Sequence, residues 1–437
     1  MINIDTLLHG RWVIPIEPEN TLLEHHSIAL QHGRIIDILK TEEANEKYQA
    51  NNVFKLNEHA LLPGLINTHT HSAMNLMRGL SDDLPLMEWL QQHIWPAEQK
   101  HVNAEYVYDG SMLACAEMLR SGTTCFNDMY FFAEETARVV EHVGMRATLG
   151  LIVLDFPSAW AQDADDYIHK GLELHDQLRG HSLIKTAFAP HAPYTVSDVP
   201  LQRIVTLAEE LDIPIHIHAH ETETEITDSI KSIGQRPLSR LEQLGLLGPR
   251  MLAVHMTQLT EDEIQRCAEL GVNVIHCPES NLKLASGFSP VHQLQMAGVN
   301  VALGTDGAAS NNDLDMLGEM HTAALLAKGV AADARALPAF QVLKMATLNA
   351  AKALGIDAET GSLVAGKSAD VIAIRLSDIE TQPIYNPLSQ IIYSAGREQV
   401  TDVWVAGKHL LKDRLLTTID EAELKSKIRG WQARIQH

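Results

Sequence analysis

Short runs of apolar residues recur along the middle of the chain, and segments with helical periodicity separate them. The eight runs are rich in Val, Ile, Leu and Ala and cover residues 61–71, 123–128, 146–153, 184–191, 213–220, 252–255, 272–277 and 299–306. Nearly continuous apolar strands are typical of a parallel sheet, which is buried on both faces. Helix-like stretches between the runs include residues 104–120, 199–211, 261–270 and 291–297. This α/β alternation predicts a (β/α)8 TIM-like barrel.

The two ends of the chain have a different pattern, in which short strands and turns alternate. Residues 12–16 and 25–37 follow it near the start, and residues 370–374 and 403–408 follow it near the end. We expect both termini to build one small β-sandwich domain. The predicted division is 1–60 for the N-terminal part of the sandwich, 61–367 for the barrel, and 368–437 for the C-terminal part with a closing helix at 421–435 that packs outside.

The composition of the chain disfavours some classes of protein and of binding partner. The 437 residues are 45% hydrophobic, which suffices for a large core, and 34 Lys+Arg against 56 Asp+Glu give a formal net charge of −22. Such a charge disfavours nucleic acid and anionic membranes as partners, because phosphate binding needs clustered cations. The start has no signal-like segment and no segment has membrane-spanning length, so we expect a cytoplasmic protein. The four scattered cysteines contain no Cys-x-x-Cys pair and are expected to be structural thiols.

Candidate metal ligands end several predicted strands. His69 and His71 are two residues apart, so they share one side of an extended strand, and Asp306 closes the eighth apolar run. The carboxyl ends of barrel strands meet at one face of the barrel. These three side chains therefore predict one composite site, in which the carboxylate of Asp306 needs a metal or a cation as its partner.

The fifth apolar run ends in three histidines and a glutamate. We favour His218 over His216 as the ligand, because Glu221 follows at the transition to the loop and can lie beside a metal without binding it. His220 is expected to be a solvated loop residue, as are the two glutamates at positions 223 and 225. His255 ends the sixth run, either as a site residue or as a core histidine.

These donors suit one divalent metal. Three imidazoles and a carboxylate, from His69, His71, His218 and Asp306, form a set typical of zinc, with ferrous iron as the alternative, and they leave a position open to water. A metal of this kind lowers the pKa of such a water to about 7.

The segments 63–71, 218–221 and 304–306, together with His255, resemble the amidohydrolase superfamily, and residues 361–371 resemble its return from barrel to sandwich. Binuclear members carry a carboxylated lysine at the end of strand four. Here that strand ends in Phe188-Ala189-Pro190-His191, so the resemblance implies a single metal. Among mononuclear members, His-x-x-Glu on strand five is typical of deaminases of aromatic rings.

More narrowly, segments 73–79, 95–98, 189–194 and 276–284 resemble the 5'-methylthioadenosine/S-adenosylhomocysteine deaminases of that superfamily. The resemblance implies metal-dependent hydrolytic deamination of the adenine ring of 5'-methylthioadenosine, with S-adenosylhomocysteine and adenosine as further substrates. Glu98 would hold the ribose hydroxyls and His191 would contact the nucleoside; a surface glutamate and a barrel-rim histidine are the alternatives.

The same resemblance implies catalytic roles for three residues. Glu221 would act as the general acid/base and protonate N1 of the ring. His255 and Asp306 would orient the water that attacks C6, and Asp306 would take its proton. Glu221 would also contact the substrate.

One departure from the resemblance concerns the substrate tail. Several relatives place an arginine just beyond strand three, and residues 150–155 contain none, which favours a neutral methylthio group over a charged homocysteine. Alternatives are a deaminase or chlorohydrolase of another purine, a pterin or a triazine, and a non-catalytic scaffold on the same barrel. By analogy with such barrels, we expect a homo-oligomer.

Overall fold

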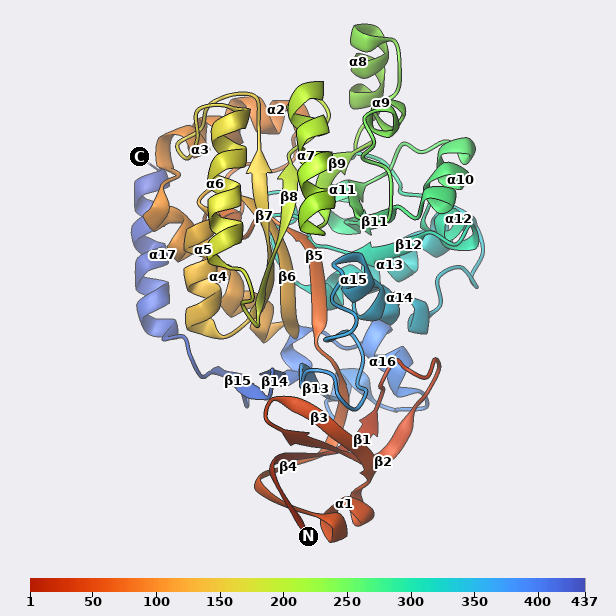
Figure 1. Ribbon diagram of the computed structural model, residues 1–437. Helices are drawn as coiled ribbons and strands as arrows, with labels where there is room; N and C mark the ends of the chain where they lie inside the picture. The colour runs from red at the N-terminus through yellow and green to blue at the C-terminus, as the bar shows by residue number, and fades with distance from the viewer. Residues whose placement is uncertain (437) are drawn as a thin grey trace.

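Two eight-stranded sheets organise the chain, whose computed structural model describes residues 1–436 (Figure 1). One sheet is parallel throughout, with its strands in sequence order. Its strands are β5 (Leu65–Thr70), β6 (Thr123–Tyr130), β7 (Arg146–Val153), β8 (Ile184–Pro190), β9 (Ile215–Ala219), β10 (Met251–His255), β11 (Asn273–His276) and β12 (Asn300–Leu303). The predicted (β/α)8 barrel is thereby confirmed.

The first and last strands of the barrel meet at a seam beside the site. The backbone N–H of Asp306 donates to the carbonyl oxygen of His69 at 3.0 Å. The hydroxyl of Thr68 donates to the carbonyl oxygen of Leu303 at 2.6 Å. These bonds bring residues that are far apart in the sequence to one end of the barrel.

Helices follow the barrel strands and cover the outside of the sheet. They are α4 (Ala104–Arg120), α5 (Ala133–Val143), α6 (Ala164–Gln177), α7 (Asp198–Leu211), α8 (Glu223–Ile233), α9 (Pro237–Gln243), α10 (Glu261–Leu270), α11 (Pro278–Lys283), α12 (Val291–Met296), α13 (Met316–Ala331), α14 (Ala339–Met345) and α15 (Leu348–Ala353). The four helical stretches predicted from periodicity are confirmed to within one residue. Local signals set the ends of α10, where Thr260 caps the first turn and Gly271, at φ +74°, ends the last.

The second sheet joins the two termini, as predicted. From the N-terminal side it contains β1 (Ile2–Val13), β2 (Leu23–Gln31), β3 (Arg34–Lys40) and β4 (Tyr48–Pro63), with helix α1 (Thr41–Lys47). From the C-terminal side it contains β13 (Val371–Arg375), β14 (Val400–Val405), β15 (Lys408–Lys412) and β16 (Leu415–Leu416). Three helices lie between β13 and β14: η3 (Ile379–Thr381), α16 (Pro387–Tyr393) and η4 (Arg397–Gln399). β13 pairs with β4, and strands of both halves share a core that buries Leu8, Ile28 and Trp404.

The first barrel strand was predicted to cover residues 61–71, and the predicted start of this strand was wrong. Residues 61–63 belong to β4 and pair with β13 in the terminal sheet. Gly64 then connects β4 to β5, at a point where a Cβ would lie 2.0 Å from the Thr124 hydroxyl oxygen. The two sheets share one nearly continuous apolar run, so hydrophobicity alone does not mark the change. The division into residues 1–60, 61–367 and 368–437 stays a prediction.

The connection between β5 and β6 contains several short helices over the barrel mouth (Figure 1). They are η1 (Ser72–Met77), α2 (Leu86–Trp89), the π-helical turn η2 (Leu90–Ile94) and α3 (Trp95–His101). Because they lie at the carboxyl end of the strands, they provide a wall for the cavity described below.

The closing helix α17 (Glu421–Gln436) packs against α4 on the outside of the barrel, as predicted (Figure 1). The indole N–H of Trp431 donates to Asp109 at 2.9 Å, and its ring contacts Tyr106 edge to face. The four cysteines are buried and unpaired, which fits structural thiols.

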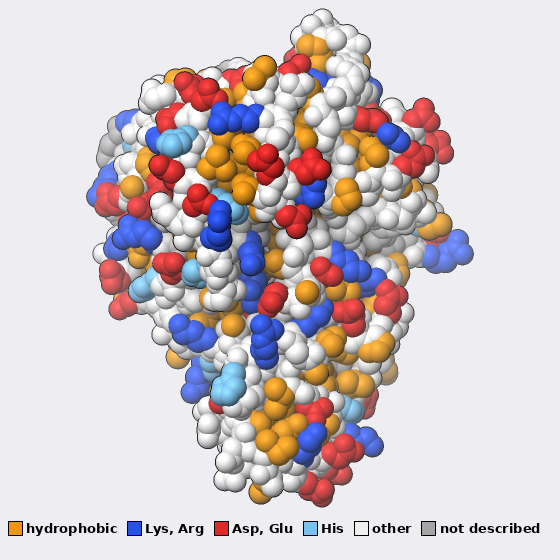
Figure 2. All heavy atoms as spheres, in the orientation of Figure 1, with side chains coloured by type: hydrophobic (Ala, Val, Ile, Leu, Met, Phe, Trp, Pro, Cys, Tyr) orange, Lys and Arg blue, Asp and Glu red, His pale blue; other side chains and the backbone are white. Residues whose placement is uncertain are grey.

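Acidic and basic side chains are interspersed on the face shown in Figure 2. Among the described residues, no helix is both long enough and apolar enough to cross a membrane.

Candidate active site

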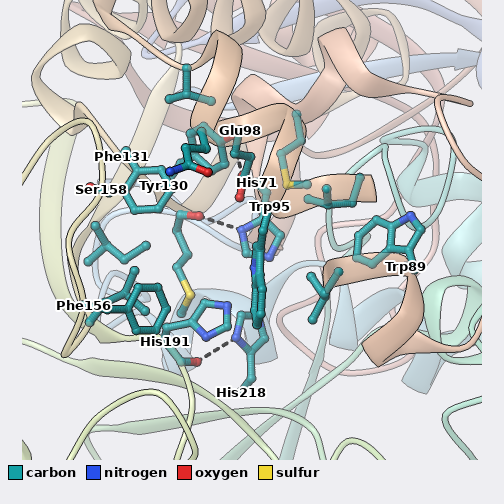
Figure 3. Close-up of a pocket in the computed structure, with 18 of the residues that line it drawn as sticks. His71, Trp89, Trp95, Glu98, Tyr130, Phe131, Phe156, Ser158, His191 and His218 are labelled. Atoms are coloured by element: carbon teal, nitrogen blue, oxygen red, sulfur yellow. Dashed lines mark hydrogen bonds between the residues drawn. The ribbon is translucent and has the colours of Figure 1, made fainter. Parts of the chain in front are cut away.

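A cavity of about 700 Å³ opens at the carboxyl ends of the barrel strands (Figure 3). Seven of the predicted site residues line it, and the eighth, His69, is buried at its base. The seven are His71, Glu98, His191, His218, Glu221, His255 and Asp306. The barrel therefore gathers the whole predicted set at one place.

His71 and His218 each have a defined tautomer. His71 donates from Nδ1 to the carbonyl oxygen of Met129 at 2.6 Å, and His218 donates from Nδ1 to the carbonyl oxygen of His191 at 2.7 Å (Figure 3). Because a carbonyl oxygen only accepts, both Nδ1 atoms carry a proton, and each ring in its neutral form presents an Nε2 lone pair. The Nε2 atom of His218 lies 3.1 Å from Nε2 of His69.

Asp306 lies opposite these imidazoles, three residues beyond the end of β12. Its backbone is left-handed, at φ +62°, which turns the chain out of the strand. Oδ1 lies 3.2 Å from Nε2 of both His69 and His71, and Oδ2 accepts hydrogen bonds from the hydroxyls of Ser280 and Ser310. Burial would raise the pKa of Asp306, but the two histidines outweigh it and hold that pKa well below its usual value.

The spacing of these atoms fits a metal. A tetrahedral zinc with ligands at about 2.0–2.1 Å separates neighbouring ligand atoms by about 3.3–3.4 Å, and the cluster shows 3.1–3.2 Å. Imidazole lone pairs and a carboxylate oxygen directed at one another repel unless a cation lies between them. His69, His71, His218 and Asp306 are therefore suited to hold a divalent metal.

His255, at the end of β10, belongs to the same cluster. Its Nδ1 pairs with the Asn281 side-chain oxygen at 2.8 Å, so the ring presents Nε2 to the centre. That atom lies within 4.8 Å of the ligand atoms of His69 and His218. His255 therefore lies beside the candidate ligands, although it is also buried and hydrogen-bonded as a core histidine would be, and its role in the site stays a prediction.

Glu221 lies on the other side of His255, with Oε2 at 3.8 Å from Nε2 of that ring. Ser286 donates a hydrogen bond to Oε1 at 3.3 Å. Burial raises the pKa of Glu221; His255 opposes this rise, and the negative charge of Asp306 adds to it. A buried carboxyl with a raised pKa beside a cavity is a candidate proton donor or acceptor.

The three histidines of the fifth strand have three different surroundings. His218 reaches the cluster, while His216 is buried behind it with Nε2 at 2.8 Å from Nδ1 of His69. The expectation that His220 is a solvated loop residue is wrong: it is fully buried, and its Nε2 accepts the backbone N–H of Leu238. Its left-handed backbone, φ +51°, ends the strand alternation that had grouped it with His216 and His218.

Of the two glutamates expected to be solvated, only one is exposed. Glu223 is exposed in the first turn of α8. Glu225 is half-buried and accepts the backbone N–H groups of His220 and Glu221, so the prediction for it was wrong.

Glu98 and His191 lie on two walls of the cavity (Figure 3). Tyr130 donates a hydrogen bond to Oε1 of Glu98 at 2.7 Å. Burial raises the pKa of Glu98 to about 7, against this hydrogen bond. Burial and the neighbouring His71 and His69 lower the pKa of His191 to about 3, so His191 is a neutral donor or acceptor.

An apolar wall of the cavity was not predicted from the sequence. Trp89 and Trp95 come from the helices after β5, and Phe156 comes from the loop after β7 (Figure 3). Their segments have no strand or helix periodicity that marks a binding surface. Among the residues described, no lysine or arginine lines this cavity.

Comparison with known proteins gives a consistent result. The model of the amidohydrolase family matches residues 60–410. A 5-methylthioadenosine/S-adenosylhomocysteine deaminase of Saccharophagus degradans is 52% identical over 99% of this chain and 97% of its own length. One of the same name from Teredinibacter turnerae is 50% identical over 99% and 98%.

Solved structures agree with this similarity. A zinc-bound adenosine deaminase of Xanthomonas campestris has a TM-score of 0.99 and 54% identity, covering 100% of this chain and 99% of its own. A zinc-bound atrazine chlorohydrolase of Arthrobacter aurescens has a TM-score of 0.91 and 21% identity, covering 98% and 100%. At that identity, the second likeness shows the fold alone.

Proposed function

This chain belongs to the amidohydrolase family, and from that premise we propose that it removes the C6 amino group of 5'-methylthioadenosine by hydrolysis, releasing the inosine analogue and ammonia. The observation that carries the proposal is that one cavity contains both Glu221, beside the cluster of candidate ligands, and Glu98. Glu221 serves the reacting ring, whereas Glu98 offers acceptors for a ribose diol that a free base lacks. The names of the full-length relatives support the same substrate.

In this proposal His69, His71, His218 and Asp306 hold one zinc ion, with ferrous iron as the alternative. Zinc in the relative from Xanthomonas campestris supports the choice. When bound, the metal lowers the pKa of a water molecule to about 7 and so supplies hydroxide for hydrolysis at neutral pH.

The protein's own residues then move the protons. Glu221 protonates N1 of the adenine ring, which makes C6 more electrophilic, a contribution of about 100- to 10,000-fold for such a group. His255 orients the attacking water, and Asp306 accepts its proton. The amino nitrogen takes the proton from Asp306 and leaves as ammonia. The remaining hydroxyl proton returns to Glu221, and the oxygen stays on C6 as the carbonyl oxygen of the inosine analogue. His191 contacts the nucleoside as a neutral imidazole.

The 5' substituent faces the apolar wall. Side chains such as Trp89, Leu90 and Phe156 suit a methylthio group, and no cation among the cavity residues of the described chain is available for the carboxylate of a homocysteine tail. Burying an unpaired carboxylate is costly. We therefore propose that kcat/KM is higher for methylthioadenosine than for S-adenosylhomocysteine.

Adenosine is a second candidate substrate. The specific support is the 54% identical structure that is named an adenosine deaminase. Adenosine retains the ring and the ribose diol and lacks only the apolar 5' group.

An ammonia-release assay on zinc-loaded enzyme tests the proposal. The panel contains methylthioadenosine, S-adenosylhomocysteine, adenosine, guanine and a triazine, and the expected order of kcat/KM begins with methylthioadenosine. Equal or reversed values for the first two would reject the preference for a neutral tail. Turnover of guanine or the triazine without the nucleosides would favour the alternative ring classes, and no turnover with zinc bound would favour a scaffold.

Glu98→Ala supplies the matched test of the ribose role. This variant should lose activity on nucleosides, and any activity on free bases should be unaffected.

A further inference from the structure

The turn after β9 carries the proposed acid/base, and a carboxylate holds its backbone. At His220 the chain adopts a left-handed conformation, φ +51°, and leaves the strand. The next two backbone donors, the N–H groups of His220 and Glu221, both point at Glu225. Oε1 accepts from His220 at 3.1 Å, and Oε2 accepts from Glu221 at 2.7 Å.

The carbonyl oxygens of the same turn accept hydrogen bonds from Thr257, which follows strand β10. The hydroxyl of Thr257 donates to the carbonyl oxygen of Glu221 at 2.6 Å. The backbone N–H of Thr257 donates to the carbonyl oxygen of His220 at 3.0 Å. The peptide groups around Glu221 are thus held on both their N–H and their carbonyl sides. Within residues 1–436, Glu225 is the acceptor for both N–H groups.

Glu225 is itself held in place. It lies in the first turn of α8, where the Thr222 side chain caps the helix and accepts the Glu225 N–H at 3.2 Å. Burial raises the pKa of Glu225 to about 7, against its hydrogen bonds to the two backbone N–H groups. In the ionised form, above that pH, these hydrogen bonds are about twice as strong as those between neutral groups. Glu225 is not among the residues that line the cavity. Any effect of Glu225 on the proton transfer therefore acts through its hydrogen bond to the backbone of Glu221.

We propose that Glu225 is a positioning residue, which sets the direction of the Glu221 carboxyl by binding the two successive N–H groups of the turn. The inference rests on the proposed deaminase function, because it assigns Glu225 to the proton transfer made by Glu221. The side-chain amide of a glutamine offers one acceptor and one donor, so Glu225→Gln opposes a donor to one of the two N–H groups.

The test compares Glu225→Gln with Glu223→Gln, which removes an exposed carboxylate from the same helical turn. For Glu225→Gln we expect kcat to fall about 10- to 100-fold, the size typical of partners that orient site residues, with KM and zinc content unchanged. Glu223→Gln should match the wild type. A raised KM with normal kcat, or loss of zinc, would overturn the assignment, because either result places the effect elsewhere.

A double-variant cycle makes the test specific to Glu221. If Glu225 acts through Glu221, adding Glu225→Gln to Glu221→Gln costs no further activity. An additive loss would overturn the inference. Should Glu225→Gln fail to fold, Glu225→Asp, which keeps the charge but is one methylene shorter, is carried through the same cycle with the same expected results.

Two readouts separate this inference from the proposed function. Wild-type turnover of the nucleoside panel tests the function alone. A crystal structure of zinc-loaded Glu225→Gln tests the positioning without any turnover: the Glu221 carboxyl should be displaced from its place beside His255. An unmoved carboxyl would overturn the inference while leaving the function intact.

Discussion

Glu221 is the residue on which the proposed chemistry depends most directly. It is buried beside His255 and is not one of the candidate ligands. Replacing it by glutamine keeps its size and removes the transferable proton. We expect Glu221→Gln to bind zinc normally and to lose about 100- to 10,000-fold in kcat, measured by ammonia release with metal analysis of the same sample. Activity close to that of the wild type would remove its assigned role.

The proposed contact between Glu98 and the ribose hydroxyls would make substrate binding dependent on pH. Burial raises its pKa to about 7, so the carboxyl becomes neutral as pH falls through neutrality and then accepts hydroxyl hydrogen bonds less well. We expect KM for methylthioadenosine to rise below about pH 7 and Glu98→Gln to abolish this dependence. A KM–pH profile of both proteins checks it, and identical profiles would contradict it.

The raised pKa of Glu98 also makes the stability of the folded protein dependent on pH. Between the ordinary glutamate pKa and about 7, the folded protein binds a proton at Glu98 that the unfolded chain has released. The contribution of Glu98 to stability is therefore largest at low pH and decreases as pH rises through this window.

At the scale of elements, the approach of β12 to β5 keeps Asp306 within reach of His69. Gly304 follows β12, and a Cβ on it would lie 2.7 Å from the backbone nitrogen of His69 and 2.8 Å from its Cβ. Rigid backbone must therefore move to accept any side chain at position 304.

We expect Gly304→Ala to lower zinc content and to destabilise the protein by about 1–3 kcal/mol, the usual cost of overpacking. Metal analysis and chemical unfolding measure the two effects. Gly329→Ala in α13 is the control, because a Cβ there meets nothing within 4 Å and alanine favours a helix. Equal zinc content in both variants would show that the seam tolerates a side chain.

At the scale of the whole molecule, a buried ion pair connects the barrel to the terminal sheet. Arg146 at the start of β7 donates from Nε to Asp370 at 2.9 Å, and from Nη2 to the Ser368 hydroxyl at 3.0 Å. Both charged side chains are less than 10% exposed. The ion pair links two segments that are more than 200 residues apart in the sequence.

Arg146→Met should destabilise the protein by about 3–5 kcal/mol, because it leaves the Asp370 carboxylate buried without its partner. Adding Asp370→Asn should cost less than the sum of the two single changes. Urea unfolding of the zinc-loaded proteins measures both. A loss below about 1 kcal/mol, the range of exposed pairs, would show that water reaches the carboxylate.

Much of the fold and of the candidate site was predictable, because it depends on residue patterns within short stretches of the sequence. Apolar runs and helical periodicity identified all eight barrel strands and helices such as α4 and α10. His69 and His71 were recognised by their two-residue spacing, and Asp306 by its place after an apolar run. Where two sheets share one apolar run, as at residues 61–63, the pattern contains no boundary.

The sequence by itself determined the barrel, the terminal β domain and the kinds of side chain at the strand ends, because these depend on residue order and periodicity. Only the tertiary structure decided that His220 is buried, that Glu225 binds the Glu221 backbone, and that Trp89 and Phe156 face the site. The physical reason is that these features depend on single backbone turns and on contacts between distant loops, which leave no periodic signal in the chain.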